Sequence, residues 1–166
     1  QSSDPLLLCV FASTPLREIF LTLPPDMEKV KQQIVVKDLG LIDYQAAWDY
    51  QEQLLKANVQ LKSRAADQLP GPTTNYLLFC EHPPVYTLGK SGHMENLLIS
   101  QEELQKQGIG FVPTNRGGDI TFHGPGQVVG YPILDLENFF TDIGKYLRCL
   151  EEVIIRTLAQ YGVTGD

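Results

Sequence analysis

Chemistry-bearing side chains in this sequence concentrate in residues 116–132, where five glycines and two prolines surround one arginine and one histidine. Glycine lets the main chain turn tightly and approach a ligand closely, so that its N–H groups can hold a polar or anionic group. A guanidinium and an imidazole beside such a turn, here Arg116 and His123, can bind and orient a polar ligand. The stretch therefore predicts a ligand site.

Two familiar phosphate-binding loops do not fit this stretch. Gly124, Gly126 and Gly130 are spaced G-x-G-x-x-x-G, one residue longer than the dinucleotide fingerprint, and a strand pattern follows where that fingerprint needs a helix. The complete Walker pattern is absent as well. A plainer alternative is a glycine-rich hairpin with a buried salt bridge from Arg116, since loops of this composition are often simply turns.

The periodicity of the stretch predicts the elements that position its side chains. Apolar and polar residues alternate over 119–123, which predicts a short, half-buried strand with Thr121 and His123 on one face. Residues 124–126 must turn the chain, and 127–136 are predicted to form a second strand, apolar enough to be largely buried. The two strands would present the guanidinium and the imidazole around one concavity.

Helices and strands alternate irregularly along the rest of the chain, which predicts a mixed α/β (α+β) fold with helices packed on a mixed sheet. Pro132 lacks a backbone donor and predicts a sheet edge or a bulge. A stripe that begins at Tyr44 predicts a helix that buries Trp48, with Ala47, Gln51 and Leu55 on the same face. The other predicted elements are strands over 34–36, 76–80 and 85–88, a helix over 101–107 between the capping pair Ser100 and Glu103 and the C-cap Gly108, and a helix over 143–161 with an apolar stripe from Ile143.

Length and composition bound the protein further. Its 166 residues suit one domain with a real core, and a net charge of -7 argues against nucleic acid as a general partner. The cysteines, Cys9, Cys80 and Cys149, are odd in number and lack metal spacing, so we expect no disulfide framework, no metal site and a reducing cytoplasm. Cys80 and Cys149 are expected to be buried and inert. The apolar run over 5–12 is too short to span a bilayer, so we expect no membrane association.

Four stretches resemble the octanoyltransferase (LipB) family of lipoyl(octanoyl) transferases. The longest is Arg116-Gly117-Gly118-x-x-Thr121-Phe122-His123-Gly124-Pro125-Gly126-Gln127-Val128. The shorter ones are Asp38-Leu39-Gly40-Leu41-x-Asp43-Tyr44, Glu81-His82-Pro83-Pro84-Val85-Tyr86-Thr87-Leu88-Gly89-Lys90 and Tyr131-Pro132-Ile133-Leu134-Asp135-Leu136. They follow one another in the family's order, which makes the resemblance specific.

The resemblance implies a fold like the catalytic domain of biotin and lipoate protein ligases. It also implies a reaction of lipoate biosynthesis, in which an octanoyl group passes from octanoylated acyl carrier protein to a cysteine and then to a lysine of a lipoyl domain. That domain would belong to a 2-oxoacid dehydrogenase complex or be the glycine cleavage H protein, and no cofactor is expected. A thiolate nucleophile divides such a transfer into two thioester-based steps.

The resemblance assigns substrate binding to Arg116, Gly117, Gly118, Asp119, Ile120, Thr121, Phe122 and His123, with His82, Lys90, Gly124, Gly126 and Gln127 as additional candidates. Main-chain donors of this stretch and His123 are expected to orient the thioester carbonyl, as preorganised oxyanion stabilisers do. No catalytic residue is assigned, because the family's lysine and cysteine belong to motifs expected beyond Asp166. We accordingly expect residues 1–33 to be an N-terminal extension and 34–166 to be an acyltransferase domain that is incomplete at its C-terminal side.

Two other functions stay open at this stage. An ATP-dependent lipoate or biotin ligase would use an adenylate-binding glycine motif, and the segment from His123 to Gln127 fits the transferase better. A noncatalytic module that binds acylated carriers or lipoyl domains would bind its partner without forming a covalent adduct.

Overall fold

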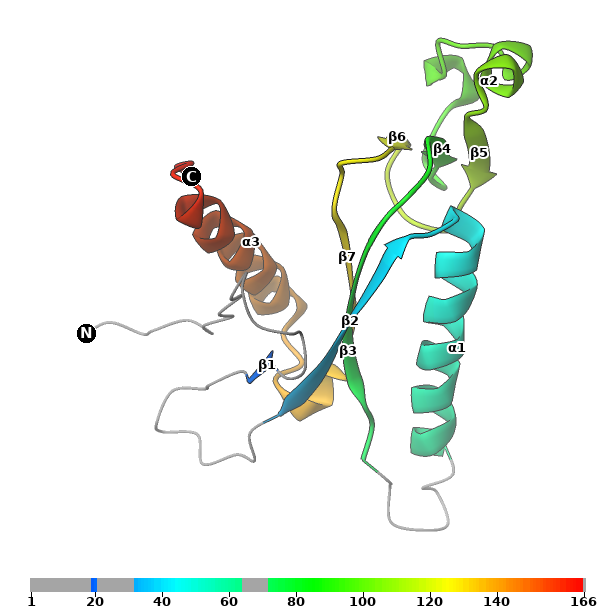
Figure 1. Ribbon diagram of the computed structural model, residues 1–166. Coiled ribbons are helices and arrows are strands. Elements are labelled where there is room, and N and C mark those ends of the chain that lie inside the picture. The colour runs from blue at the N-terminus through cyan, green and yellow to red at the C-terminus, as the bar shows by residue number, and fades with distance from the viewer. Residues whose placement is uncertain (1–18, 21–31, 64–71, 166) are drawn as a thin grey trace. The chain divides into compact units, whose positions relative to one another are not determined.

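The computed structural model describes residues 19–20, 32–63 and 72–165. Its strands form two sheets, one in the order β1-β2-β3-β7 and the other in the order β5-β4-β6 (Figure 1). The strands are β1 Ile19–Phe20, β2 Gln33–Leu41, β3 Asn75–Glu81, β4 Val85–Leu88, β5 Gly110–Pro113, β6 Ile120–His123 and β7 Val129–Ile133; the α-helices are α1 Tyr44–Ser63, α2 Gln101–Gln107 and α3 Ile143–Gln160; short 3-10 turns span Met94–Asn96 and Leu136–Asn138. The predicted mixed α+β class is confirmed.

Contacts within the chain group it into two units. The second unit comprises Asp38–Gln60 and Leu78–Tyr131, and the first takes the other described residues. All of the predicted site residues lie in the second unit. Most of the expected extension, residues 1–33, lies outside the described residues, although β1 belongs to it and pairs antiparallel with β2.

The three-stranded sheet of the second unit is built around β4, which lies between β5 and β6 (Figure 1). β4 pairs in parallel with β5, where Val85 is opposite Gly110, and antiparallel with β6, where Val85 is also opposite His123. Alternation along β4 buries Val85 and Thr87, and the latter is fully buried opposite Thr121. The predicted strand over 85–88 is confirmed, and the buried Thr87 hydroxyl on it donates to the Thr121 carbonyl oxygen of β6 at 3.4 Å.

Helices α1 and α2 both begin in the second unit, where capping residues predict. The Ser100 hydroxyl accepts a hydrogen bond from the Glu103 N–H at 3.2 Å, and Gly108 ends α2 with a left-handed φ of 67°. The Asp43 carboxylate likewise accepts from the main-chain N–H three residues further on, at the start of α1. α2 has the predicted bounds and buries Leu104, which is 2% exposed.

The buried face of α1 differs from the predicted stripe. Tyr44 and Ala47 are buried as expected, but Trp48 is only half-buried and Leu55 is 49% exposed, whereas Asn58 is buried. The Trp48 ring packs edge-on against the Tyr44 ring at 6.2 Å rather than entering the core. The buried face of α1 therefore includes Ala47 and Asn58. Tertiary packing, and not side-chain hydrophobicity alone, decides which side of a long helix is covered.

The bend after β6 connects the two sheets. β6 pairs with β4, whereas β7 is hydrogen-bonded to β3, so the glycine-rich hairpin considered from the sequence is wrong. The second predicted strand, over 127–136, is shortened to β7 and is half-buried, and Val128 before it is 67% exposed. Pro132 lies on β7, at the edge of its sheet, as predicted.

Helix α3 ends one residue before the predicted helix over 143–161, and it does not bury its apolar stripe. Its first turn is capped by the Asp142 carboxylate, which accepts from the Lys145 N–H at 2.9 Å. Ile143, Leu147 and Ile154 are 59%, 53% and 60% exposed, and no residue of the helix is buried. The expected burial of Cys149 is accordingly wrong, since this cysteine is half-buried.

Candidate functional site

Arg116 holds the main chain of the glycine loop in place. Its guanidinium donates to the carbonyl oxygens of Thr87, Gly117 and Asp119 at 3.1, 2.9 and 2.9 Å, and to the Thr87 hydroxyl at 2.8 Å. Thr87 is fully buried, so a charged donor satisfies groups that water does not reach. The buried salt bridge considered for Arg116 is absent among the described residues, because its four acceptors are three carbonyls and one hydroxyl.

The loop rests directly on the end of β4. The Gly89 N–H donates to the Asp119 carbonyl at 3.2 Å, and the Lys90 N–H donates to the Arg116 carbonyl at 2.9 Å. A Cβ atom at Gly89 would collide with the Gly118 carbonyl oxygen. Gly118 itself has a φ of 82°, which lies in the left-handed region that favours glycine. Gly89 is thus required by a close main-chain contact, and Gly118 is favoured by its left-handed backbone.

The Asp119 carboxylate organises the neighbouring turn. It accepts hydrogen bonds from the His93 N–H at 3.2 Å and from the Asn96 side-chain amide. Desolvation acts to raise the pKa of Asp119, but these hydrogen bonds outweigh it and hold the pKa below its ordinary value. Asp119 therefore serves as a charged anchor for residues 93–96, and its oxygens are already occupied by the protein.

Two imidazoles and two phenols form a cluster of ring contacts, made by Tyr44, His82, His123 and Tyr131. His82 is fully buried at its centre. Its Nδ1 lies 2.8 Å from the Ile42 carbonyl oxygen, which can only accept, so Nδ1 carries the proton and Nε2 accepts from the Tyr131 hydroxyl at 2.9 Å. Burial raises the pKa of Tyr131 well above its ordinary value, so its phenol stays protonated and donates. His82 is thus fully buried and bonded on both ring nitrogens by the protein, and it does not face an open cavity.

His123 contacts this cluster through its ring. Its plane stacks on Tyr44 at 5.8 Å and meets the His82 ring edge-on at 5.7 Å. Its Nδ1 lies 2.5 Å from the side-chain oxygen of Gln127, while Nε2 makes no hydrogen bond with any described residue. Desolvation raises the pKa of Tyr44, and the positive charge of Arg116 opposes the shift. The His123 imidazole therefore packs against the rings of Tyr44 and His82, and its Nε2 has no hydrogen-bond partner among the described residues.

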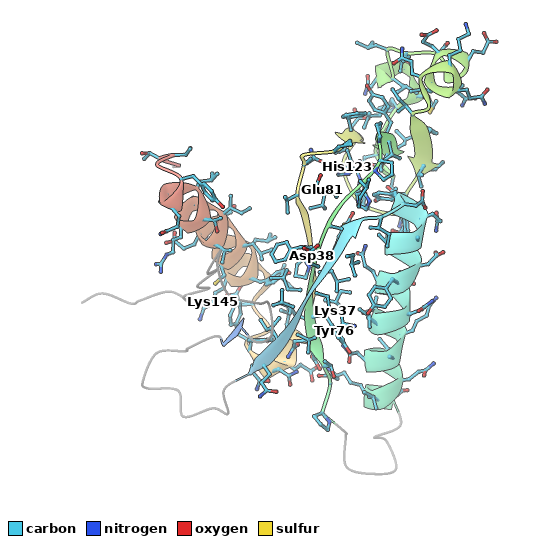
Figure 2. The ribbon with its side chains drawn as sticks, in the orientation of Figure 1. Lys37, Asp38, Tyr76, Glu81, His123 and Lys145 are labelled. Atoms are coloured by element: carbon cyan, nitrogen blue, oxygen red, sulfur yellow. The ribbon has the colours of Figure 1, made fainter. Side chains whose placement is uncertain are left out.

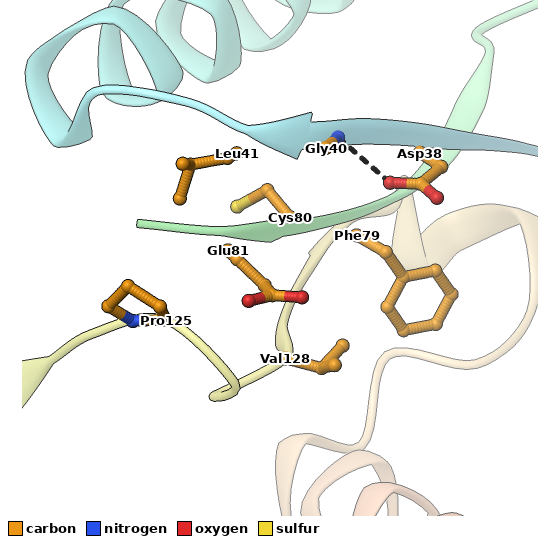
Figure 3. A pocket seen from close by; sticks show the side chains of 8 residues that line it. All are labelled: Asp38, Gly40, Leu41, Phe79, Cys80, Glu81, Pro125 and Val128. Atoms are coloured by element: carbon orange, nitrogen blue, oxygen red, sulfur yellow. Dashed lines mark hydrogen bonds between the residues drawn. The ribbon is translucent and has the colours of Figure 1, made fainter. Parts of the chain in front are cut away.

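A pocket of about 250 Å³ adjoins the bend (Figure 3). Its lining residues are Asp38, Gly40, Leu41, Phe79, Cys80, Glu81, Pro125 and Val128. The Glu81 carboxylate accepts from the Gly126 N–H at 2.6 Å, which ties the bend to β3. Asp38, Glu81 and His123 come from β2, β3 and β6 (Figure 2). Pro125 and Val128 of the bend line this pocket, whereas Arg116 and His123, which were predicted to surround one concavity, do not.

Cys80 lies in this wall but is not activated. Its residue is 2% exposed, and burial, together with the negative charge of Asp38, raises the pKa of the thiol. A raised pKa keeps the sulfur protonated, and the thiolate is the nucleophilic form. The expectation that Cys80 is buried and inert agrees with this environment.

The remaining predicted residues are distributed around these groups. Ile120 and Thr121 are half-buried, and Phe122 is 44% exposed with its ring 4.9 Å from that of Tyr86. Gly124 is buried, and the Lys90 side chain is exposed. Sequence reasoning did not single out Tyr44, Glu81 and Tyr131 as site residues. A signal for all three existed, because each belongs to a stretch that resembles the family.

Two kinds of feature are absent from the described residues. No group of three or more histidine, cysteine, aspartate or glutamate side chains is arranged to hold a metal ion there. Over the same residues, no helix has both the length and the apolar character required to cross a bilayer.

The described residues thus form an α+β fold with a clamped glycine loop, an imidazole at its edge and a pocket beside the bend after β6. The family model described as the lipoyl protein ligase A/B catalytic domain matches residues 43–166. The chain belongs to this family, which confirms the resemblance of the sequence to it.

Three curated relatives share the name octanoyltransferase. The protein of Flavobacterium johnsoniae is 59% identical over 135 residues, which cover 81% of this chain and 58% of the relative. The proteins of Flavobacterium psychrophilum and Christiangramia forsetii are 58% and 56% identical, and each match covers 82% of this chain and 59% of the relative. The chain thus spans less than two thirds of the length of these relatives.

Proposed function

We propose that this chain is part of an octanoyltransferase of lipoate biosynthesis, an acyltransferase that moves an octanoyl group from acyl carrier protein to a lysine of a lipoyl domain. The observation that carries the proposal is the 56–59% identity to relatives of that name over about four fifths of this chain. The same observation favours the transferase over an ATP-dependent ligase. Residues 116–123 are the proposed substrate-binding stretch.

The geometry around the glycine loop supports an acyl substrate. Leu41, Phe79 and Val128 give the pocket apolar walls, and burying an acyl chain is worth about 0.8 kcal/mol for each CH2 group. The loop is held by Arg116 before any ligand binds, so little ordering cost is expected on binding. The exposed cation of Lys90 suits the acidic carrier proteins that we propose as partners.

The cysteine thioester is part of the proposal, and neither described cysteine suits it. Cys80 is buried with a raised pKa, and Cys149 is half-buried on α3. We therefore place the nucleophile and its lysine partner elsewhere in the whole protein. The same observation favours a second candidate function for the described residues, a module that binds acylated carriers without a covalent step.

Mass spectrometry of the undigested whole protein, after incubation with octanoyl acyl carrier protein, distinguishes these functions. An octanoyl adduct that hydroxylamine removes supports the transferase. Retention of the carrier without a gain in mass supports the binding module. Release of pyrophosphate in the presence of lipoate and ATP would instead support a ligase.

A pair of variants tests whether the pocket beside the bend holds the acyl chain. Val128→Trp would fill the pocket, and Leu98→Trp adds the same ring at a side chain that is 97% exposed and does not line it. We expect V128W to weaken binding of octanoyl carrier at least about tenfold, which corresponds to 1.4 kcal/mol. L98W and binding of the acyl-free carrier should be unchanged. If V128W weakened binding of the octanoyl carrier and of the acyl-free carrier equally, the pocket would not be the site that holds the acyl chain.

A further inference from the structure

The hydrogen bond between His123 and Gln127 fixes where the imidazole carries its proton. Nδ1 lies 2.5 Å from Oε1 of Gln127, an oxygen that has lone pairs and no hydrogen. The hydrogen of this bond must therefore come from Nδ1. A neutral imidazole has only one N–H, so Nε2 is left with a lone pair.

The bend holds Gln127 where it can make this bond. Its N–H donates to the Gly124 carbonyl oxygen at 3.1 Å and closes the turn. The preceding Gly126 has a φ of 85°, and its N–H is held by the Glu81 carboxylate at 2.6 Å. Two independent contacts thus fix the main chain from which the Gln127 side chain reaches back to His123.

Neighbouring rings fix the plane of His123. Tyr44 stacks on it with an interplanar angle of 22°, and His82 meets it at 71°. The two imidazoles share the Nδ1-protonated form, but their second nitrogens differ. Nε2 of His82 accepts from Tyr131, whereas Nε2 of His123 has no partner among the described residues.

We propose that Gln127 is a positioning residue that holds neutral His123 with its proton on Nδ1 and its Nε2 open as a hydrogen-bond acceptor. A carbonyl oxygen has no hydrogen to offer, so neutral His123 does not orient the thioester carbonyl in the way expected from the sequence. Its partner is a ligand group that carries a hydrogen. Within the proposed function, on which this last step rests, that group is the amine of the acceptor lysine.

The protonation pattern can be read directly by long-range proton–nitrogen NMR of the 15N-labelled protein near pH 8.5, about two pH units above the ordinary histidine pKa. We expect His123 to be protonated on Nδ1. Gln127→Leu should shift it to the Nε2-protonated form, while Gln127→Glu, whose carboxylate also accepts, should retain Nδ1–H. Gln105→Leu, at an exposed position of α2, serves as the matched control. Loss of the signals in His123→Gln but not in His93→Gln assigns them.

Two results would overturn the assignment of Gln127. One is an Nε2-protonated His123 in the unaltered protein, and the other is an unchanged pattern in Gln127→Leu. Neither experiment contains an acyl substrate, so their outcome is independent of whether the whole protein transfers octanoyl groups.

A second titration tests the partner of Nε2. Butylamine carries the hydrogen-bond donor of a lysine side chain, and methyl octanoate carries only the carbonyl and the acyl chain. We expect the Nε2 resonance of His123 to move with butylamine and not with the ester. Movement with the ester alone, or with neither probe, would overturn the amine as partner and leave the protonation result standing.

Discussion

The site region of the second unit and helix α3 of the first unit differ in the range of the contacts that hold their side chains. In the site region, partners are far apart in the sequence: Arg116 bonds Thr87, and His82 bonds Tyr131. In α3 they are four residues apart, as for Arg156 and Glu152 at 2.6 Å. A helix can thus form from local bonds, whereas a ligand site needs groups that only the fold brings together.

Burial follows the same contrast. Leu104 in the second unit is 2% exposed, while Leu147 on α3 is 53% exposed. We expect Leu104→Ala to lower the free energy of unfolding by about 3 kcal/mol, because a buried leucine leaves a cavity. Leu147→Ala should cost less than about 1 kcal/mol, the range of surface substitutions. Urea unfolding followed by circular dichroism measures both, and equal losses would show that the stripe of α3 is covered in solution.

The close approach at Gly89 should give the next largest effect. Gly89→Ala places a methyl group against the Gly118 carbonyl, so we expect a loss of about 2 kcal/mol in unfolding free energy. Gly117→Ala is the matched control, since its Cβ would meet nothing within 4 Å and its φ is not left-handed. A similar loss in both variants would mean that the contact between the loop and β4 is not what requires glycine.

Arg116→Lys tests the clamp on the loop. An ammonium cannot reproduce the planar fork that bonds the Thr87 hydroxyl and the carbonyls together, so we expect a loss of about 1.5 kcal/mol. Amide exchange of Gly89, which donates to the Asp119 carbonyl, should become faster. Arg148→Lys, at a side chain that is 85% exposed on α3, should change neither measurement.

The smallest effect is expected at Asp135 in the first unit. Desolvation acts to raise its pKa, but hydrogen bonds from Lys62 at 2.9 Å and Thr73 at 2.9 Å hold the pKa below its ordinary value. A pKa lowered by folding contributes stability above the unfolded value of about 3.9, and this contribution is lost as the pH falls through the folded value.

Asp135→Asn should therefore cost less than about 1 kcal/mol at pH 7, because the lysine side chain is 39% exposed and solvent screens the pair. The difference from the unaltered protein should shrink below pH 4 as the carboxylate is protonated. Glu137→Gln, which alters a 69% exposed carboxylate at 3.0 Å from the same lysine, should have a smaller effect. Urea unfolding at pH 7 and pH 3 measures both variants. A stability difference between Asp135→Asn and the unaltered protein that is larger at pH 3 than at pH 7 would contradict a lowered pKa of Asp135.

Local sequence rules predicted several elements with their boundaries. α2 begins after Ser100 and ends at Gly108, and β4 covers the predicted strand, because caps and short periodic runs depend on neighbours within a few positions. The same rules failed for burial on α1, where Asn58 is covered and Leu55 is not. They also did not predict that β6 pairs with β4, because hydrogen bonds between strands join residues that are far apart in the sequence.

The sequence determined the family, since the glycine stretch and its ordered companions occur together in residues 38–136, and it predicted that the site lies at the glycine stretch. It did not determine what each side chain does. Only the tertiary structure showed that Arg116 bonds the protein's own carbonyls, that His82 is buried behind His123 and that Glu81 holds the bend. The physical reason is that residue type fixes which hydrogens and lone pairs a group has, whereas the fold decides which of them are already used.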